Sequence, residues 1–217
     1  MKNLFKYLAL LVMGVMVSAS CNGTKKNDVN IINNKQNNEM DTTDTTKATG
    51  KTLIVFFSHA GENYSVGNVK VGNTKLVADE IQKLTGGDEF EIVCEKNYNM
   101  PYDDLTRLAK EEQYNGEKPA FKGKIKNIEQ YETVFIGGPI WWGTYPQVMF
   151  SFFDKYDLNG KTIIPFSTHE GSGLGSVVED LKKLYPQATF KEAFSIYGHE
   201  ARKSTKSVDA WVKELGY

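Results

Sequence analysis

The residues best suited to binding a flat ring lie in one short segment, Gly137–Pro146, which reads GGPIWWGTYP. Trp141 and Trp142 are adjacent and stand at the end of a predicted strand. Because the layers open to solvent there, packing in a core does not account for both side chains. Indole faces suit stacking on planar, electron-poor rings, and Gly143 can adopt either of two peptide orientations beside a ligand. We expect one indole to contact the ligand and the other to pack against the helix that begins near Pro146.

A second loop offers a site for phosphate. It runs from Ser58 through the sequence HAGENY and reaches Gly72-Asn73-Thr74 where helical periodicity begins. Free backbone N–H groups and the positive end of a helix dipole bind phosphate without a cation. Gly67 and Gly72 have Walker A spacing, but Asn73 stands where that motif needs Lys, which disfavours nucleotide hydrolysis. The alternative interpretation is an ordinary turn and helix N-cap.

A third glycine-rich loop, Ser167–Gly175, reads STHEGSGLG and also permits close backbone approach to a ligand. It follows a later strand, which argues against a dinucleotide fingerprint, because that motif follows the first strand. His169 is the candidate catalytic residue, as a hydrogen-bond donor to the ring or to an acceptor oxygen; the alternative is a solvated bystander. No metal-binding spacing such as CxxC or HExxH is present, so no metal site is predicted.

The elements that must position these loops follow from hydrophobic periodicity. Apolar runs predict strands at residues 53–57, 90–94, 133–136, 162–166 and 190–196, the first buried on both faces. Helical stripes alternate with them. They comprise Val77, Ile81 and Leu84; Tyr102 to Tyr114; Met149, Phe152, Phe153 and Tyr156; Leu174, Val177, Val178, Leu181 and Leu184; and Val208, Trp211, Val212 and Leu215. This alternation predicts a doubly wound parallel sheet with helices on both faces, whose ligand binds at the carboxyl ends of the strands.

The three loops, in this order on five strand–helix units, resemble the flavodoxin family over about residues 51–217. The resemblance implies a flavodoxin-like α/β fold with five parallel strands in the order 2-1-3-4-5, and noncovalent binding of FMN. It also implies the contacts. The phosphate would meet Ser58, Gly72, Asn73 and Thr74; the isoalloxazine would meet Pro139, Ile140, Trp141, Trp142 and Gly143; its other side would meet Thr168, His169, Gly171 and Gly173.

Two departures from the flavodoxin pattern affect the site. About ten extra residues separate Ser58 from Gly72, where flavodoxins have a compact turn. Flavodoxins also commonly place a Tyr of the third loop over the flavin, and no aromatic residue occurs between Ser167 and Gly175. One face of the flavin is therefore expected to be open to a substrate ring or a partner protein.

Three functions are compatible with these residues. The first is an FMN-dependent oxidoreductase that takes electrons from NAD(P)H or a protein donor and reduces a quinone or similar small acceptor. The second is a non-enzymatic electron carrier with protein partners, which the weak charge of the domain disfavours. The third is a flavin-free binding module, against which the Trp pair argues.

The first fifty residues predict targeting rather than fold. Lys2 and Lys6 precede a short apolar stretch that ends at Ser18-Ala19-Ser20-Cys21, which resembles a lipoprotein signal peptide (residues 1–20) with lipidation at Cys21, although Ser18 stands where such signals usually have Leu. An ordinary secretory signal is the alternative. The polar composition of residues 21–50 predicts a disordered tether, and the protein is expected at the cell-envelope membrane.

Charge and cysteine content add two limits. The first fifty residues hold 6 of the 26 basic and 4 of the 27 acidic residues, which leaves 20 basic and 23 acidic residues and a net charge of −3 for the domain. Nucleic acid is therefore not an expected partner.

If Cys21 carries lipid, Cys94 is the one remaining cysteine, so no intramolecular disulfide is expected. Cys94 is predicted to be a buried, unreactive thiol.

Overall fold

The computed structural model describes residues 50–217. The predicted signal peptide, Cys21 and all of the predicted tether except Gly50 lie outside this range. Within it, the central sheet contains β1 (Lys51–Phe56), β4 (Asp88–Glu91), β7 (Tyr131–Pro139), β8 (Thr162–His169) and β10 (Phe194–Tyr197). The strand order is β4-β1-β7-β8-β10, with every pairing parallel. Numbered along the chain, this is the predicted order 2-1-3-4-5.

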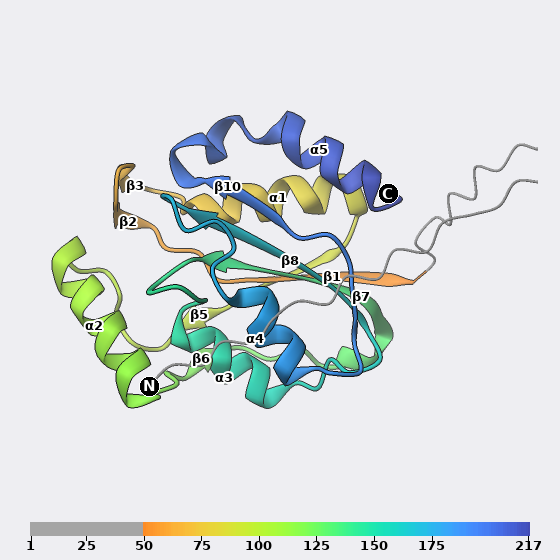
Figure 1. The fold of residues 1–217 in the computed structure, drawn as a ribbon, viewed down its shortest axis with the longest axis horizontal. Helices are drawn as coiled ribbons and strands as arrows, with labels where there is room; N and C mark the ends of the chain where they lie inside the picture. Colours follow the sequence, from red (N-terminus) through yellow and green to blue (C-terminus); the bar gives the residue numbers. More distant parts are fainter. Residues whose placement is uncertain (1–49) are drawn as a thin grey trace, which may run out of the picture. The chain divides into compact units, whose positions relative to one another are not determined.

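Helices cover both faces of the sheet (Figure 1). On one face lie α1 (Asn73–Thr85) and α5 (Thr205–Glu214), and on the other α3 (Gln147–Lys155) and α4 (Val177–Leu184). The helix α2 (Tyr102–Asn115) contributes Leu105 to the core beneath α3 and α4. Each helix of the sequence prediction is therefore present, and together with the sheet order the α/β doubly wound fold is confirmed.

The strand β1 shows why the sheet is covered on both faces. Leu53 and Val55 point into the core shared with α3 and α4, whereas Ile54 and Phe56 point into the core shared with α1 and α5. All four side chains are at most 2% exposed. An uninterrupted apolar run is what a strand between two helical layers requires, because successive side chains alternate between the faces.

Three element boundaries differ from the sequence prediction. The second strand ends at Glu91, and Val93–Cys94 (β5) pairs instead with Phe121–Lys122 (β6) in a separate antiparallel ladder. The predicted strand at 190–196 is divided into β9 (Thr189–Phe190) and β10, and between them the Glu192 carbonyl accepts the indole N–H of Trp211 at 3.0 Å. The helix expected from Leu174 begins at Val177, because Gly173 and Gly175 adopt φ of 58° and 51°.

The extra residues of the first loop form a structure of their own. Gly61–Asn63 (β2) and Gly67–Val69 (β3) pair as an antiparallel hairpin between the end of β1 and the start of α1. Two short 3₁₀ helices, η1 (Ile128–Gln130) and η2 (Gly198–Lys203), lead into β7 and α5 respectively.

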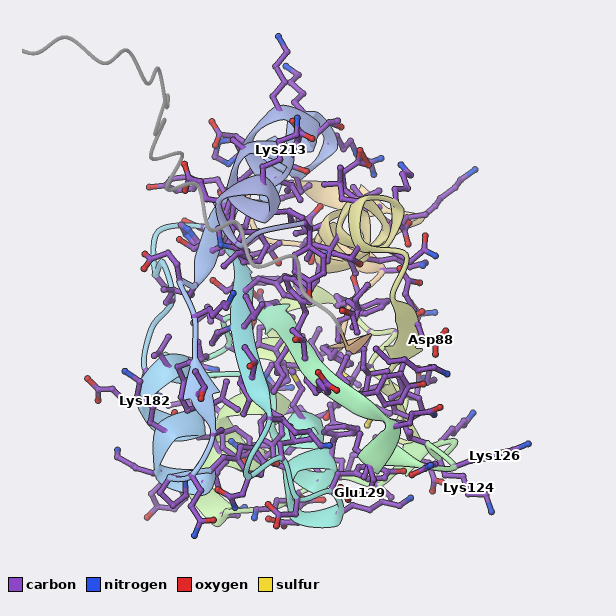
Figure 2. The ribbon with its side chains drawn as sticks, turned by 90° about the vertical axis from the view of Figure 1, so that its right-hand side faces the viewer. Asp88, Lys124, Lys126, Glu129, Lys182 and Lys213 are labelled. Carbon is purple, nitrogen blue, oxygen red and sulfur yellow. The ribbon has the colours of Figure 1, made fainter. Side chains whose placement is uncertain are left out.

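The outer surface carries dispersed charge. Lys182 and Lys213 project at places well separated from each other and from the neighbouring pair Lys124 and Lys126 (Figure 2). Among residues 50–217, no helix combines the length and apolar character that crossing a bilayer would require.

Candidate cofactor-binding site

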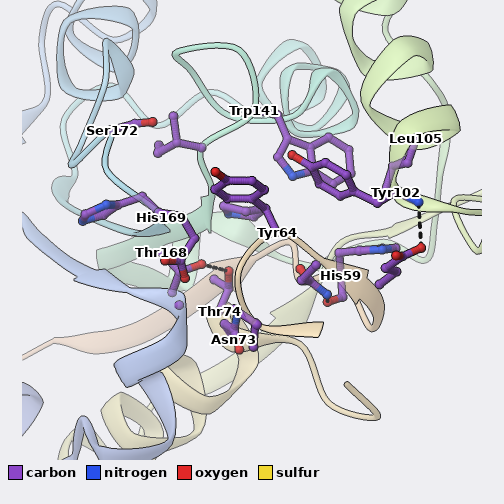
Figure 3. Close-up of a pocket in the computed structure, with 17 residues that line it drawn as sticks. His59, Tyr64, Asn73, Thr74, Tyr102, Leu105, Trp141, Thr168, His169 and Ser172 are labelled. Carbon is purple, nitrogen blue, oxygen red and sulfur yellow. Dashed lines mark hydrogen bonds between the residues drawn. The ribbon is translucent and has the colours of Figure 1, made fainter. Parts of the chain in front are cut away.

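The carboxyl ends of β1, β7 and β8 meet at one edge of the sheet. Phe56 is in register with Gly137, and Pro139 with Thr168, so the three predicted ligand loops emerge side by side. Between them lies a cleft of about 220 Å³ (Figure 3). Its lining comprises His59, Glu62, Asn63, Tyr64, Val66, Asn73, Thr74, Tyr102, Leu105, Pro139, Ile140, Trp141, Thr168, His169, Glu170, Ser172 and Gly198.

The start of α1 forms one end of this cleft. Thr74 is 1% exposed, and its hydroxyl lies 2.8 Å from the hydroxyl of Thr168, which ties the helix start to the end of β8. Gly72 is the N-cap residue, and a side chain there would collide with the Ser58 hydroxyl and the His59 carbonyl. Ser58 accepts the Lys75 N–H at 3.0 Å and so caps the helix from outside, while its own O–H remains able to donate.

Two buried polar atoms, on residues that line the cleft, have no hydrogen-bond partner among the described residues. They are Nε2 of His59 and Oδ1 of Asn73. Burial lowers the pKa of His59, so its imidazole is neutral at pH 7. Such atoms are expensive to leave unpaired. A neutral imidazole and an amide oxygen are groups that can pair with hydroxyl groups.

No Lys or Arg occurs among the residues that line the cleft. An anion at this end would be held by backbone amides, the Thr74 hydroxyl and the dipole of the 13-residue helix α1. The two carboxylates of the lining already have donors. Glu62 accepts the Tyr102 N–H at 3.0 Å, and Glu170 accepts the His199 N–H at 2.9 Å and lies 2.7 Å from His199 Nδ1.

Both tryptophans belong to one tight turn, Trp141–Thr144. The N–H of Trp141 donates to the Thr144 carbonyl at 2.8 Å, and the N–H of Thr144 donates to the Trp141 carbonyl at 3.3 Å. The two central residues, Trp142 and Gly143, have φ of 51° and 89°. Positive φ at both central positions is the type I′ arrangement. The Gly143 carbonyl accepts the Ser176 N–H at 2.8 Å, which connects the turn to the third loop.

The turn sends the two indoles to different places. Trp141 lines the cleft and is packed by Phe57, Tyr98 and His59 at centroid distances of 5.5, 5.5 and 6.0 Å. The Trp142 indole N–H donates to the Thr106 carbonyl of α2 at 3.0 Å, with Lys110 Nζ 4.7 Å from its ring centroid. One indole therefore faces the cleft and one packs on a helix. That helix is α2, whereas the sequence prediction named the helix after Pro146.

His169 lines both the cleft and a neighbouring hollow, and its ring centroid lies 4.6 Å from that of Tyr197. Its Nδ1 accepts the Gly171 N–H at 2.9 Å, so the ring proton is on Nε2. Burial lowers the pKa of His169, which favours this neutral form. Gly171 and Gly173 line a separate hollow with Phe194 and Tyr197, and Ser172 between them lines the cleft. The two glycines shape the loop through φ of 126° and 58°.

The model of the flavodoxin family matches residues 51–215. The chain belongs to this family. Among solved structures, a candidate flavoprotein from Bacteroides eggerthii is 30% identical with a TM-score of 0.62, and the match covers 77% of this chain and 98% of that one. A second candidate flavoprotein, from Bacteroides uniformis, is 27% identical with a TM-score of 0.62, over 76% of this chain and 98% of that one.

A more distant solved structure has the same fold. It is a flavoprotein from Lactobacillus acidophilus in complex with FMN, 18% identical with a TM-score of 0.52, over 72% of this chain and 99% of that one. No curated protein matches this flavodoxin.

Several residues of this flavodoxin line the cleft without having been predicted from the sequence. Tyr64, Glu62, Asn63 and Val66 come from the β2–β3 hairpin, and Tyr102 and Leu105 from α2. The unusual length of the first loop is the one sequence signal that pointed to the hairpin. The position of α2 could not be inferred, because the stripe from Tyr102 to Tyr114 identifies a helix but not its place beside the cleft.

A second hollow adjoins the cleft of this flavodoxin. Its volume is about 250 Å³, and Tyr102, Leu105, Ile140 and Trp141 line both spaces. The residues that line this second hollow alone are Thr106, Ala109 and Trp142. The lining of this hollow is mainly aliphatic and aromatic with the hydroxyl-bearing Thr106, and it contains no titratable group apart from the Tyr102 phenol. Among the described residues, no group of three His, Cys, Asp or Glu side chains is arranged to hold a metal ion.

Proposed function

We propose that this flavodoxin binds one FMN noncovalently in the cleft and reduces a quinone or a similar flat, uncharged acceptor. The observation that carries the proposal is the cleft at the ends of β1, β7 and β8. It joins a helix N-terminus lined with Asn73 and Thr74 to an indole, Trp141, within one continuous space. Membership of the flavodoxin family supports FMN as the ligand.

Each part of FMN has residues suited to it. The phosphate would take the amides at the start of α1 with the hydroxyls of Thr74 and Ser58. The ribityl hydroxyls would pair with the unpartnered atoms of Asn73 and His59. The isoalloxazine would lie against Trp141, beside Pro139 and Ile140. This assignment satisfies the two buried polar atoms that the protein alone leaves unpaired.

When bound, FMN supplies the transfer of one or two electrons. The chain itself would position the flavin and set the electrostatic environment around its ring. With its proton on Nε2, His169 can donate a hydrogen bond to the flavin edge or to an acceptor oxygen without carrying charge. The second hollow gives an uncharged acceptor a route to the cleft past Tyr102 and Ile140. A small acceptor is favoured over a protein partner because this hollow is mainly aliphatic and aromatic and the domain has a net charge of only −3.

The proposal is tested by titrating the purified domain with FMN and with riboflavin, following flavin absorbance and Trp fluorescence. We expect saturable binding with quenching of Trp141. The double substitution Asn73→Ala/Thr74→Val should weaken FMN binding much more than riboflavin binding, because only FMN carries the phosphate. Thr85→Val at the opposite end of α1, where the hydroxyl bonds the Ile81 carbonyl at 2.9 Å, is the matched control.

Two results would overturn the assignment. A domain that binds neither flavin would be a binding module, and equal losses for FMN and riboflavin would place the phosphate elsewhere. Stopped-flow mixing of the FMN-loaded protein with NADPH and a soluble quinone separates the enzyme from the carrier. Rapid bleaching and reoxidation without a second protein favours the enzyme, whereas reduction only through an added protein donor favours the carrier.

Attachment to the cell-envelope membrane through Cys21 is part of the proposed function. It rests on the small residues before Cys21 and the short apolar stretch that precedes them. A membrane location would keep the acceptor hollow close to apolar quinones.

A further inference from the structure

One carboxylate lies at the end of the cleft where the phosphate is proposed to bind. Glu170 directly follows the last residue of β8, its side chain is 15% exposed, and it lines the cleft together with Asn73 and Thr74. No Lys or Arg among the lining residues compensates its charge. Because partial burial reduces screening, a carboxylate here would repel a phosphate more strongly than it would in bulk water.

Gly198, the first residue of η2, shows how close Glu170 is to the start of α1. A Cβ placed on Gly198 would lie 3.0 Å from Oε1 of Glu170 and 2.6 Å from Nδ2 of Asn73. The Asn73 side chain is the one whose Oδ1 has no partner among the described residues. The carboxylate and this amide therefore converge on one point beside the first residue of the helix.

Glu170 is held in this position by His199. Its Oε1 accepts the backbone N–H of His199 at 2.9 Å, and its Oε2 lies 2.7 Å from His199 Nδ1. The two contacts join the third loop to η2. The side chain of His199 is 50% exposed, so it can exchange a proton with solvent. The pair is neutral when His199 is protonated and carries a single negative charge when the imidazole is neutral.

Tyr197 and His169 are the titratable neighbours of the pair on the side of the sheet. The ring centroid of Tyr197 lies 5.2 Å from that of His199 and 4.6 Å from that of His169. Burial lowers the pKa of His169, and the negative charge of Glu170 opposes this lowering. The charge of Glu170 is therefore felt by a residue that lines the cleft.

The other charged residues of η2 do not replace His199 as the counter-charge. Glu200 lines the separate hollow beside the third loop. Within residues 50–217, neither Arg202 nor Lys203 forms an ion pair with Glu170, whose one ion-pair partner is His199. Protonation of His199 is thus the local means of neutralising the carboxylate.

We propose that the Glu170–His199 pair sets the charge that the cleft accepts at the start of α1 and thereby controls the affinity for the FMN phosphate. This inference rests on the proposed binding of FMN. With His199 protonated, the phosphate meets a neutral pair, and with His199 neutral, it is repelled by Glu170. Because imidazole side chains change charge between about pH 5 and pH 8, the repulsion grows as the pH rises through this range. Riboflavin has no phosphate, so its affinity does not respond to the pair.

The experiment measures Kd for FMN and for riboflavin at pH 6 and pH 8 in the purified protein, with flavin fluorescence as the readout. Glu170→Gln removes the charge and keeps the size of the side chain. At pH 8 we expect this variant to bind FMN about tenfold more tightly than wild type, and at pH 6 the gain should be much smaller. Riboflavin binding should be unchanged, which also shows that the cleft is intact.

His199→Gln removes the counter-charge and should have the complementary effect. We expect it to bind FMN more weakly than wild type at pH 6 and equally at pH 8. The double variant Glu170→Gln/His199→Gln should behave as Glu170→Gln alone, because the histidine acts only through the carboxylate. Comparing variants at one pH cancels the titration of the FMN phosphate itself, which also occurs near pH 6.

The matched control is Glu200→Gln, which removes the same charge from η2 at a residue that lines the separate hollow. It should leave the Kd for FMN within about twofold of wild type at both pH values, because exposed charges outside the cleft are screened.

The outcomes separate this inference from the proposed function. Wild-type protein that binds neither flavin would remove both. Tight FMN binding by wild type, with a Kd at pH 8 that Glu170→Gln leaves unchanged or raises, would refute the role of the pair and leave the FMN site standing. Equal changes for FMN and riboflavin would also overturn the inference, because they would show that Glu170 does not act on the phosphate.

Discussion

Trp142 shows how one backbone dihedral assigns different roles to two identical side chains. A bulky residue at φ of 51° is strained by about 1–3 kcal/mol. The indole hydrogen bond to Thr106 and the cation–π contact with Lys110 offset part of that cost. The type I′ turn with Gly143 therefore directs Trp142 to α2 and Trp141 to the cleft, which makes Trp141 the residue through which a flavin would be detected.

His59 gives the apoprotein a dependence on pH. Its folded pKa is lowered by burial from an ordinary value of 6.5, so the folded state resists protonation that the unfolded state accepts. Above about pH 7 both states are neutral and His59 contributes nothing. As the pH falls below the unfolded pKa, the unfolded state is favoured, and wild type should lose stability relative to His59→Gln.

Urea unfolding of both proteins between pH 8 and pH 5 measures this difference. His169 has a pKa lowered in the same direction, but it is present in both proteins and its effect cancels. A difference in unfolding free energy that stays constant over this pH range would contradict the assignment.

At the residue scale, much of the candidate site could be predicted because it is local to strand ends. Asn73, Thr74, Trp141, Thr168 and His169 were predicted, and the structure brings them to one cleft. The hairpin residues could not be predicted in the same way. Their position depends on the contact between Glu62 and the N–H of Tyr102, which is 40 residues away in the chain.

At the scale of elements, the parallel arrangement of β7 and β8 determines where the loops emerge. The hydroxyl of Tyr145 lies 2.8 Å from the Ile136 carbonyl and 2.9 Å from the Phe166 carbonyl, and the residue is 1% exposed. Tyr145 thus joins the two strands just before both loops begin. Its side chain also lies beneath Gly138, where a Cβ would meet the Tyr145 ring.

Tyr145→Phe should therefore lower both stability and FMN affinity. Loss of the hydroxyl leaves two buried carbonyls without this donor and should cost about 1–3 kcal/mol of unfolding free energy. We expect weaker FMN binding because the ends of β7 and β8 lose the group that joins them. Denaturant unfolding and an FMN titration of the same samples measure the two effects.

The matched control is Tyr185→Phe. Tyr185 is also buried, and its hydroxyl donates to carbonyls of Phe153 and Tyr156 at 3.1 and 3.0 Å, outside the residues that line the cleft. It should lose a similar amount of stability with no change in FMN affinity. Equal effects of the two substitutions on FMN binding would show that Tyr145 has no local role.

Secondary structure was predictable where burial is strong and less so at the sheet edges. The central strands β1, β7 and β8 contain long apolar runs, and their centres were predicted correctly. The edge strands β4 and β10 are bonded on one side, and their bounds depend on the pairing of β5 with β6 and on the Trp211 hydrogen bond from α5, which no local pattern contains. Gly173 and Gly175 delay α4 although the apolar stripe begins at Leu174.

At the scale of the whole molecule, the weak charge of the domain predicts how membrane attachment must work. The 20 basic and 23 acidic residues after position 50 leave a net charge of −3. A juxtamembrane basic cluster adds about 1 kcal/mol per residue to binding on anionic lipid, and the domain as a whole has no excess of basic residues to supply that attraction. Attachment would therefore depend on acyl chains at Cys21, each buried methylene contributing about 0.8 kcal/mol.

Cys21→Ser should consequently move the protein completely from the membrane fraction to the soluble fraction, at low salt as well as at high salt. Cys94→Ser is the matched control and should remain with the membrane, because Cys94 lies within the folded domain, where partial burial raises the pKa of its thiol. Fractionation with immunodetection at two salt concentrations measures both variants. If Cys21→Ser stayed membrane-bound and salt released it, the domain surface would be the anchor, and the proposed lipidation would be wrong.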